Sequence, residues 1–155
     1  KVFGISIHYH NRNQLPSIIE DSLEATYWNH LDEMIKRMDI ISINCPLNHE
    51  TKGLMSKKRF NLMMPNSYII NSSRSELIDE EALNLMLKNN KIAGAGLDVF
   101  SRERKKNLEL LNASNTILIP HMGSATVEGR IEMGEKVIIN IKTYIDGHNP
   151  PNRII

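Results

Sequence analysis

The chain has 155 residues, of which 41% are hydrophobic and 24% charged, and its formal net charge is +1. This length predicts one domain that buries roughly two-thirds of its unfolded surface. The near-neutral charge argues against a nucleic-acid partner, and no apolar run reaches the ~18 residues of a membrane-spanning helix. The single cysteine, Cys45, has no internal disulfide partner, so we expect a reducing, cytoplasmic location.

Short apolar runs alternate with helical stripes along the chain. Strands are predicted at residues 2–9, 25–28, 40–44, 67–71, 95–99 and 117–119. Helices are predicted at 30–37, from 56 onward, at 80–88 after an amino-terminal cap at Asp79, and from a cap at Ser124 to a stop at Gly147. Alternation of strands and helices indicates an α/β fold with a parallel sheet.

Three residues of catalytic type lie in loops that follow predicted strands. They are Arg74, Glu103 and His121. Because the carboxyl ends of parallel strands meet at one edge of the sheet, we expect these side chains to converge there. A guanidinium, a carboxylate and an imidazole at one edge are suited to hold a carboxylate substrate and to move a proton.

Three segments carry a resemblance to a known family. They are 71–83 (Asn-Ser-Ser-Arg-Ser-Glu-Leu-Ile-Asp-Glu-Glu-Ala-Leu), 93–100 (Ala-Gly-Ala-Gly-Leu-Asp-Val-Phe) and 119–126 (Ile-Pro-His-Met-Gly-Ser-Ala-Thr). In these motifs and in their spacing (103 − 74 = 29 and 121 − 103 = 18) the chain resembles the D-2-hydroxyacid dehydrogenases, most closely the glyoxylate/hydroxypyruvate reductases.

The resemblance implies a fold and a domain organisation. The fold is α/β, a Rossmann-like parallel sheet flanked by helices, here without the family's first strand and glycine-rich loop. Residues 1–155 would be the carboxyl-terminal part of a nucleotide-binding domain, with the substrate domain absent. We therefore expect this chain alone to bind NADPH weakly, because the pyrophosphate normally rests on that loop and the helix after it. We also expect it to self-associate, because the strand at residues 2–9 would lack its neighbour in the sheet.

The resemblance also implies a set of site residues. His121 would donate a proton, Glu103 would pair with it, and Arg74 would bind the substrate carboxylate. The residues expected to contact the cofactor are Asn11, Arg12, Cys45, Pro46, Thr51, Ser72, Ser73, Arg74, Asp98, His121, Gly123 and Ser124. Without the resemblance, residues 101–106 would be interpreted as a solvated charged loop and His121 as an ordinary loop histidine.

The end of the first predicted strand bears on the choice of cofactor. An acidic residue there hydrogen-bonds the ribose of NAD, and by resemblance that position is Asn11, followed by Arg12. A neutral amide and a cation favour NADP over NAD, whereas the alternative is a polar loop with a solvated arginine. His8 and His10 share one strand face, but no third ligand accompanies them, so no metal site is predicted.

The function implied is reduction of a small 2-oxo acid of the glyoxylate or hydroxypyruvate type to the D-2-hydroxy acid with NAD(P)H. A homodimer is expected for the full-length protein, with no nucleic-acid or membrane partner. Two alternatives stay open. One is an NAD(P)-sensing or scaffolding module without turnover, and the other is an inactive fragment.

Overall fold

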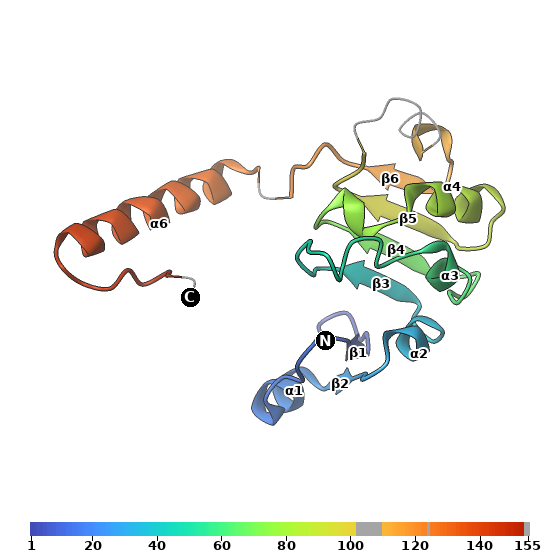
Figure 1. Ribbon diagram of the computed structural model, residues 1–155, viewed down its shortest axis with the longest axis horizontal. Coiled ribbons are helices and arrows are strands. Elements are labelled where there is room, and N and C mark those ends of the chain that lie inside the picture. Colours follow the sequence, from blue (N-terminus) through green and yellow to red (C-terminus); the bar gives the residue numbers. More distant parts are fainter. Residues whose placement is uncertain (102–109, 124, 154–155) are drawn as a thin grey trace. The chain divides into compact units, whose positions relative to one another are not determined.

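The computed structural model describes residues 1–101, 110–123 and 125–153. The chain divides into two compact units, Lys1–Leu118 and Ile119–Ile155. All the described strands belong to the first unit, whereas the second contains one long helix (Figure 1).

Parallel strands and helices alternate through the first unit, as predicted. In chain order the elements are β1 (Ile7–Tyr9), α1 (Ser17–Leu23), β2 (Ala25–Tyr27), α2 (Leu31–Ile35), β3 (Ile40–Ile43), α3 (Lys57–Phe60), β4 (Tyr68–Asn71), the 3-10 turn η1 (Ser75–Leu77), α4 (Glu80–Lys88), β5 (Gly94–Leu97), β6 (Thr116–Leu118) and, in the second unit, α6 (Val127–Ile145). β1 pairs with β2, and the other four strands form one parallel sheet in the order β3-β4-β5-β6. The predicted Rossmann-like α/β class is confirmed.

The register of the four-stranded sheet aligns its strand ends. Ile43 lies opposite Asn71, and Asn71 lies opposite Leu97. The loops that follow β3, β4 and β5 therefore leave the sheet side by side at one edge (Figure 1). Several of the residues predicted for the site follow these three strands.

The side-chain alternation of the strands creates one buried face. Ile41, Ile43 and Ile69 are at most 7% exposed, whereas their neighbours Ile40 and Ile70 are at least 41% exposed. This alternation arises because successive strand residues point to opposite faces of the sheet. The buried face packs against α2, α3 and α4. The core residues are Ile35, Ile41, Ile43, Met55, Phe60, Met63, Ile69, Leu77, Ile78, Ala82, Leu83, Met86, Leu87, Ile92, Ala95, Leu97 and Leu110.

At the start of the chain, one strand is shorter than predicted and one helix was not predicted. The strand expected over 2–9 is confined to Ile7–Tyr9, because Gly4 has a φ of 67° and closes a turn by donating to the Lys1 carbonyl at 2.9 Å. Helix α1 was not predicted, because Pro16 interrupts the segment after the first strand. Pro16 instead begins the helix, and its carbonyl accepts from the Ile19 amide at 2.9 Å. Proline is tolerated there because the first amides of a helix have no partner within it.

The predicted amino-terminal cap is confirmed for α4 but not for α6. Asp79 caps α4 as predicted, since its Oδ1 accepts from the Ala82 amide at 3.0 Å. The long final helix is also confirmed, but its cap is Thr126, whose Oγ1 accepts from the Gly129 amide at 3.0 Å. The predicted cap, Ser124, is therefore wrong, and it lies outside the described residues. Threonine and serine are both good caps, so composition did not decide between them.

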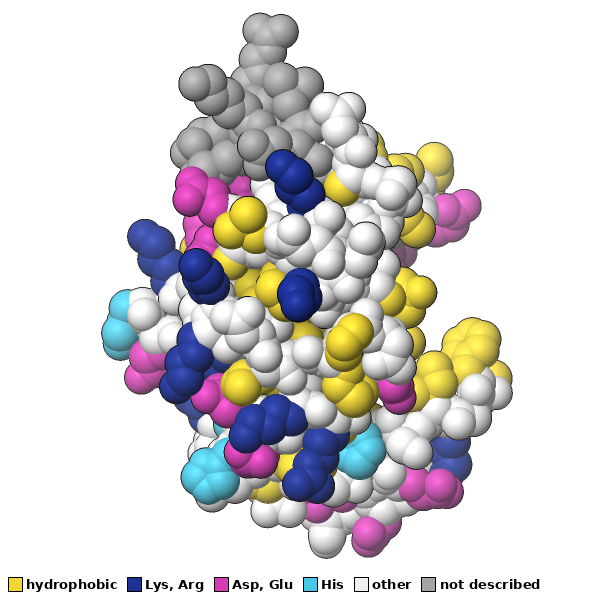
Figure 2. Space-filling view, turned by 90° about the vertical axis from the view of Figure 1, so that its right-hand side faces the viewer, with side chains coloured by type: hydrophobic (Ala, Val, Ile, Leu, Met, Phe, Trp, Pro, Cys, Tyr) yellow, Lys and Arg dark blue, Asp and Glu magenta, His cyan; other side chains and the backbone are white. Residues whose placement is uncertain are grey.

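Charged side chains of both signs are mixed over the face drawn in Figure 2, in keeping with a net charge of +1. In the part of the chain that the structure describes, no helix has both the length and the hydrophobicity that a membrane span requires.

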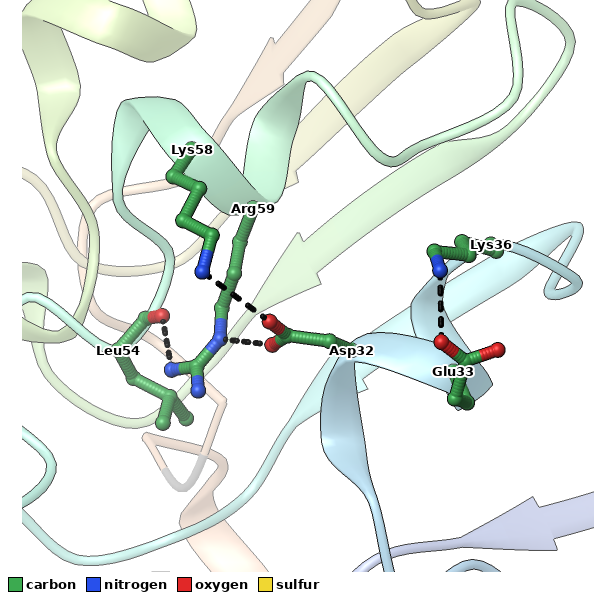
Figure 3. Close-up of polar contacts among 6 residues, drawn as sticks. All are labelled: Asp32, Glu33, Lys36, Leu54, Lys58 and Arg59. Atoms are coloured by element: carbon green, nitrogen blue, oxygen red, sulfur yellow. Dashed lines mark hydrogen bonds and ion pairs between the residues drawn. The ribbon is translucent and has the colours of Figure 1, made fainter.

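An ion pair links α2 to α3 (Figure 3). Arg59 Nε donates to Asp32 Oδ1 at 2.7 Å, and its Nη1 donates to the Leu54 carbonyl at 2.8 Å. The hydrogen bond from Arg59 is the main cause that lowers the pKa of Asp32 below its ordinary value. The same guanidinium thus holds α2 to α3 and fixes the segment before α3.

Gly94 lies where two strands approach too closely for a side chain. A Cβ there would lie 2.8 Å from the Asn115 carbonyl oxygen and 3.2 Å from the Tyr68 ring. That carbonyl accepts from the Ala95 amide at 3.0 Å, so it is fixed by the sheet. At Gly96 the nearest atom, Ile70 Cγ1, would be 3.9 Å away, which is an ordinary contact.

We predict that Gly94→Ala lowers the free energy of unfolding by about 1–3 kcal/mol, because the Asn115 carbonyl must move. Gly96→Ala is the matched control, and we expect it to change stability by less than about 0.5 kcal/mol. Urea unfolding of this chain followed by far-UV circular dichroism measures both. Equal unfolding midpoints for the two variants would contradict the close approach at Gly94.

We also predict that Asp32→Asn lowers the free energy of unfolding by roughly 0.5–1 kcal/mol at neutral pH, since the pair is partly exposed. A carboxyl with a lowered pKa stabilises the fold above its unfolded pKa of about 3.9, and this is lost as the pH falls through the lower folded value. The difference between wild type and variant should therefore shrink on acidification.

The matched control for this prediction is Glu33→Gln, which breaks the more exposed Glu33–Lys36 pair within one helix turn. We expect a smaller loss there, and one that vanishes in concentrated salt. Equal losses for the two variants at every salt concentration would show that the α2–α3 pair has no special role.

Candidate functional site

The loops that follow β3, β4 and β5 are joined by hydrogen bonds at the sheet edge. Ser73 Oγ, after β4, donates to the Cys45 carbonyl, after β3, at 2.7 Å. The Asp98 amide, after β5, donates to the Asn71 carbonyl at 2.9 Å. Cys45, Ser73, Arg74 and Asp98 therefore lie together at this edge.

The loop after β3 is closed by a threonine. Thr51 Oγ1 donates to the Pro46 carbonyl at 2.7 Å and accepts from the Asn48 amide at 2.8 Å. Thr51 therefore shapes this loop, and Pro46 is exposed on it. The Cys45 thiol is partly buried, and this burial raises its pKa, which disfavours the nucleophilic thiolate.

The loop after β4 presents Arg74 to solvent. Ser72 and Arg74 are exposed, and Arg74 has an extended backbone with φ −142° and ψ 141°. Its Nη1 donates to the Ser73 carbonyl at 2.7 Å, which uses one of the five N–H donors of a guanidinium. An exposed, charged fork on a fixed loop is suited to bind a carboxylate.

The loop after β1 is held at both ends by tyrosines. Tyr27 donates its hydroxyl to the Asn11 carbonyl at 3.1 Å, and the Tyr9 hydroxyl accepts from the Leu15 amide at 2.8 Å. Asn11 and Arg12 are exposed between these anchors. The loop thus offers an amide and a guanidinium on a fixed backbone.

A carboxylate near this loop is already engaged. Glu20 of α1 accepts from the Tyr9 hydroxyl at 2.5 Å and from Gln14 Nε2 at 3.0 Å. Partial burial and then the bond to Glu20 raise the pKa of Tyr9, so the phenol keeps its proton. Sequence analysis missed this network because it did not predict α1, although the pair Ile19 and Leu23 at helical spacing was a usable signal.

His8 and His10 are both bound to one tryptophan. Trp28 Nε1 donates to His8 Nδ1 at 3.1 Å, and His10 Nδ1 donates to the Trp28 carbonyl at 2.7 Å. Among the residues that the structure describes, no three histidine, cysteine or acidic side chains are grouped so as to hold a metal ion. The two histidines thus join the end of β1 to Trp28, which follows β2.

The remaining predicted residues belong to the second unit or fall outside the described residues. His121 and Gly123 belong to the second unit and are exposed. His121 has a φ of 51°, and its amide donates to the Ile119 carbonyl at 3.0 Å. Glu103 and Ser124 fall outside the described residues. The convergence of Arg74, Glu103 and His121 therefore stays a prediction.

The parallel sheet and the helices that flank it define a Rossmann-like α/β fold. Pro46 on the loop after β3 and Ser72 on the loop after β4 are exposed at the carboxyl edge of this sheet. Residues 1–123 match the model of the D-isomer specific 2-hydroxyacid dehydrogenase, NAD binding domain. The chain belongs to this family of NAD(P)-dependent oxidoreductases.

Relatives of known name support the assignment. The chain is 41% identical over 154 residues to the glyoxylate reductase of Thermococcus litoralis, covering 99% of this chain and 46% of that protein. It is 42% identical over 146 residues to glyoxylate reductase 1 of Saccharomyces cerevisiae, covering 94% and 41%. The chain thus spans about half the length of the curated relatives it matches.

A solved structure gives the same result. The NADPH-dependent glyoxylate/hydroxypyruvate reductase of Sinorhizobium meliloti, crystallised with NADP and malonate, superimposes with a TM-score of 0.82 at 34% identity. That match covers 93% of this chain and 44% of the solved one.

Proposed function

We propose that this chain supplies cofactor-binding and catalytic residues to an enzyme that reduces glyoxylate, hydroxypyruvate or a similar small 2-oxo acid to the D-2-hydroxy acid. The observation that carries the proposal is Arg74, exposed on the loop after β4 of a chain that is 41% and 42% identical to two glyoxylate reductases. The homodimer and the cytoplasmic location stay predictions.

Each residue has a distinct task in this proposal. The nicotinamide cofactor, when bound, supplies a hydride. Arg74 binds the substrate carboxylate and polarises the neighbouring carbonyl. His121 donates a proton to the carbonyl oxygen, because both ring nitrogens of a protonated imidazole are donors. Glu103 favours the protonated ring and holds its orientation.

We further propose that NADPH is preferred to NADH. Residues 10–15 contain no carboxylate, and Glu20, the acidic residue next along the chain, is bound to Tyr9 and Gln14. A 2′-phosphate near Asn11 would therefore meet no free carboxylate from this loop, and Arg12 is exposed beside it. A guanidinium is suited to pair with a phosphate.

Variants of the three proposed catalytic residues test the reduction of the 2-oxo acid in the full gene product. This is the longest polypeptide encoded by the gene that contains these 155 residues. We expect His121→Gln to reduce kcat by about 100-fold or more while NADPH still binds. Arg74→Ala should raise KM for the 2-oxo acid and lower kcat, because the carbonyl is less polarised. Steady-state NADPH oxidation at 340 nm measures both.

His148→Gln is the control for general effects of losing a histidine, since His148 is an exposed loop residue.

Glu103→Gln should move the pH profile of kcat/KM to lower pH, because the carboxylate that favoured the imidazolium is gone. An unchanged profile in that variant would remove Glu103 from the mechanism. Full turnover in His121→Gln would overturn the reaction proposed, whereas a wild-type protein that binds NADPH without turnover would favour a sensing module.

The cofactor preference is tested by Arg12→Ala. We expect this change to weaken NADPH binding by about 1.5–3 kcal/mol, the value of one charged contact, and to leave NADH binding nearly unchanged. Fluorescence titration of the full gene product with each cofactor measures the difference. Equal losses for NADPH and NADH would mean that Arg12 is structural.

A further inference from the structure

One buried amide lies directly behind the proposed substrate arginine. Asn71 is the last residue of β4 and is only 1% exposed. A side chain with both a donor and an acceptor is costly to bury unless both are used. Both are used here, and both partners belong to the loop that carries Arg74.

The amide of Asn71 spans this loop. Its Oδ1 accepts from the Ser73 amide at 3.0 Å, and its Nδ2 donates to the Arg74 carbonyl at 2.8 Å. The same carbonyl accepts from the Leu77 amide at 3.3 Å, so it also begins η1. Two bonds from one side chain thus fix the backbone on both sides of the Arg74 Cα.

The base of this arrangement is itself fixed. The Asn71 carbonyl accepts from the Asp98 amide of the neighbouring strand end at 2.9 Å. On the other side, Ser73 Oγ donates to the Cys45 carbonyl at 2.7 Å. Asn71 therefore holds the loop between anchored points on β3 and β5, and a long exposed arginine starts from a rigid backbone.

Asparagine suits this position for a chemical reason. An ionised aspartate keeps an acceptor for the Ser73 amide but turns a second oxygen toward the Arg74 carbonyl, where a donor is needed. A protonated aspartate restores the donor and so mimics the amide. The titratable or charged groups near this loop include Arg74 itself, Glu76 of η1, Cys45 after β3 and Asp98 after β5.

We propose that Asn71 is a positioning residue, which sets the affinity for the 2-oxo acid by holding the backbone of Arg74 in its extended conformation. The inference rests on the proposed role of Arg74 as the residue that binds the substrate carboxylate. Asn71 itself contacts neither substrate nor cofactor in this account. Its effect passes only through the Ser73 amide and the Arg74 carbonyl.

The test is Asn71→Asp in the full gene product. At pH 8 we expect KM for glyoxylate to rise about ten-fold or more, with Kd for NADPH changed by less than about two-fold. The ratio of variant to wild-type KM should fall as the pH is lowered toward 5.5, because the buried aspartate becomes protonated. Should this variant fail to fold, the neutral Asn71→Ser is expected to give the same KM effect without the pH dependence.

Ser67→Ala is the matched structural control. Ser67 is fully buried just before the same strand, and its Oγ donates to the Met64 carbonyl at 2.7 Å, far along β4 from Arg74. We expect this variant to lower the melting temperature and to leave KM for glyoxylate unchanged. A melting temperature that falls in both variants while KM stays constant in both would overturn the proposal for Asn71.

The outcomes separate this inference from the proposed function. If Arg74→Ala raises KM for glyoxylate but neither Asn71 variant does, only the role of Asn71 is wrong. If Arg74→Ala leaves KM unchanged, the proposed function and this inference are both wrong. Equal losses in NADPH and glyoxylate binding in Asn71→Asp would also overturn it, because the effect would then not be specific to the 2-oxo acid.

Discussion

The parallel pairing of β3, β4 and β5 is the constraint on which the rest of the first unit depends. Its register places Ile43, Asn71 and Leu97 side by side, so three loops begin at one edge. The close approach at Gly94, where no Cβ fits, involves the neighbours on both sides of β5, Asn115 just before β6 and Tyr68 of β4. Ile41 and Ile69 are buried on the core face of the sheet. Their burial stabilises this register, because a slip by one residue would turn the core face toward solvent.

Polar side chains then convert the aligned strand ends into fixed loops. Thr51 closes the loop after β3, Asn71 spans the loop after β4, and Ser73 joins the two through the Cys45 carbonyl. In our account the cofactor lies along the first of these loops and the substrate carboxylate meets Arg74 on the second. A shared hydrogen bond means that displacement of one loop is transmitted to the other.

Local sequence patterns predicted the strands and the family, whereas one helix and the loop hydrogen bonds were not predicted. Apolar runs such as Ile40–Ile43 marked the buried strands well, and the motif around Arg74 carried the family, because both are local patterns. Helix α1 was missed since a proline at a helix start and a proline that ends a strand look alike in sequence. The bonds from Asn71 and Thr51 were not predictable, because they depend on loop geometry that forms only after the strands pair.

The central claim is that Arg74 holds the carboxylate of a 2-oxo acid beside the cofactor while His121 faces the carbonyl oxygen. A crystal structure of the full gene product with NADPH and the unreactive dicarboxylate oxalate tests it most directly. The account predicts Arg74 nitrogens within about 2.7–3.2 Å of oxalate oxygens, and a His121 ring nitrogen at a similar distance from another oxalate oxygen. Oxalate bound beside the nicotinamide by other residues, with Arg74 or His121 directed into solvent, would contradict it.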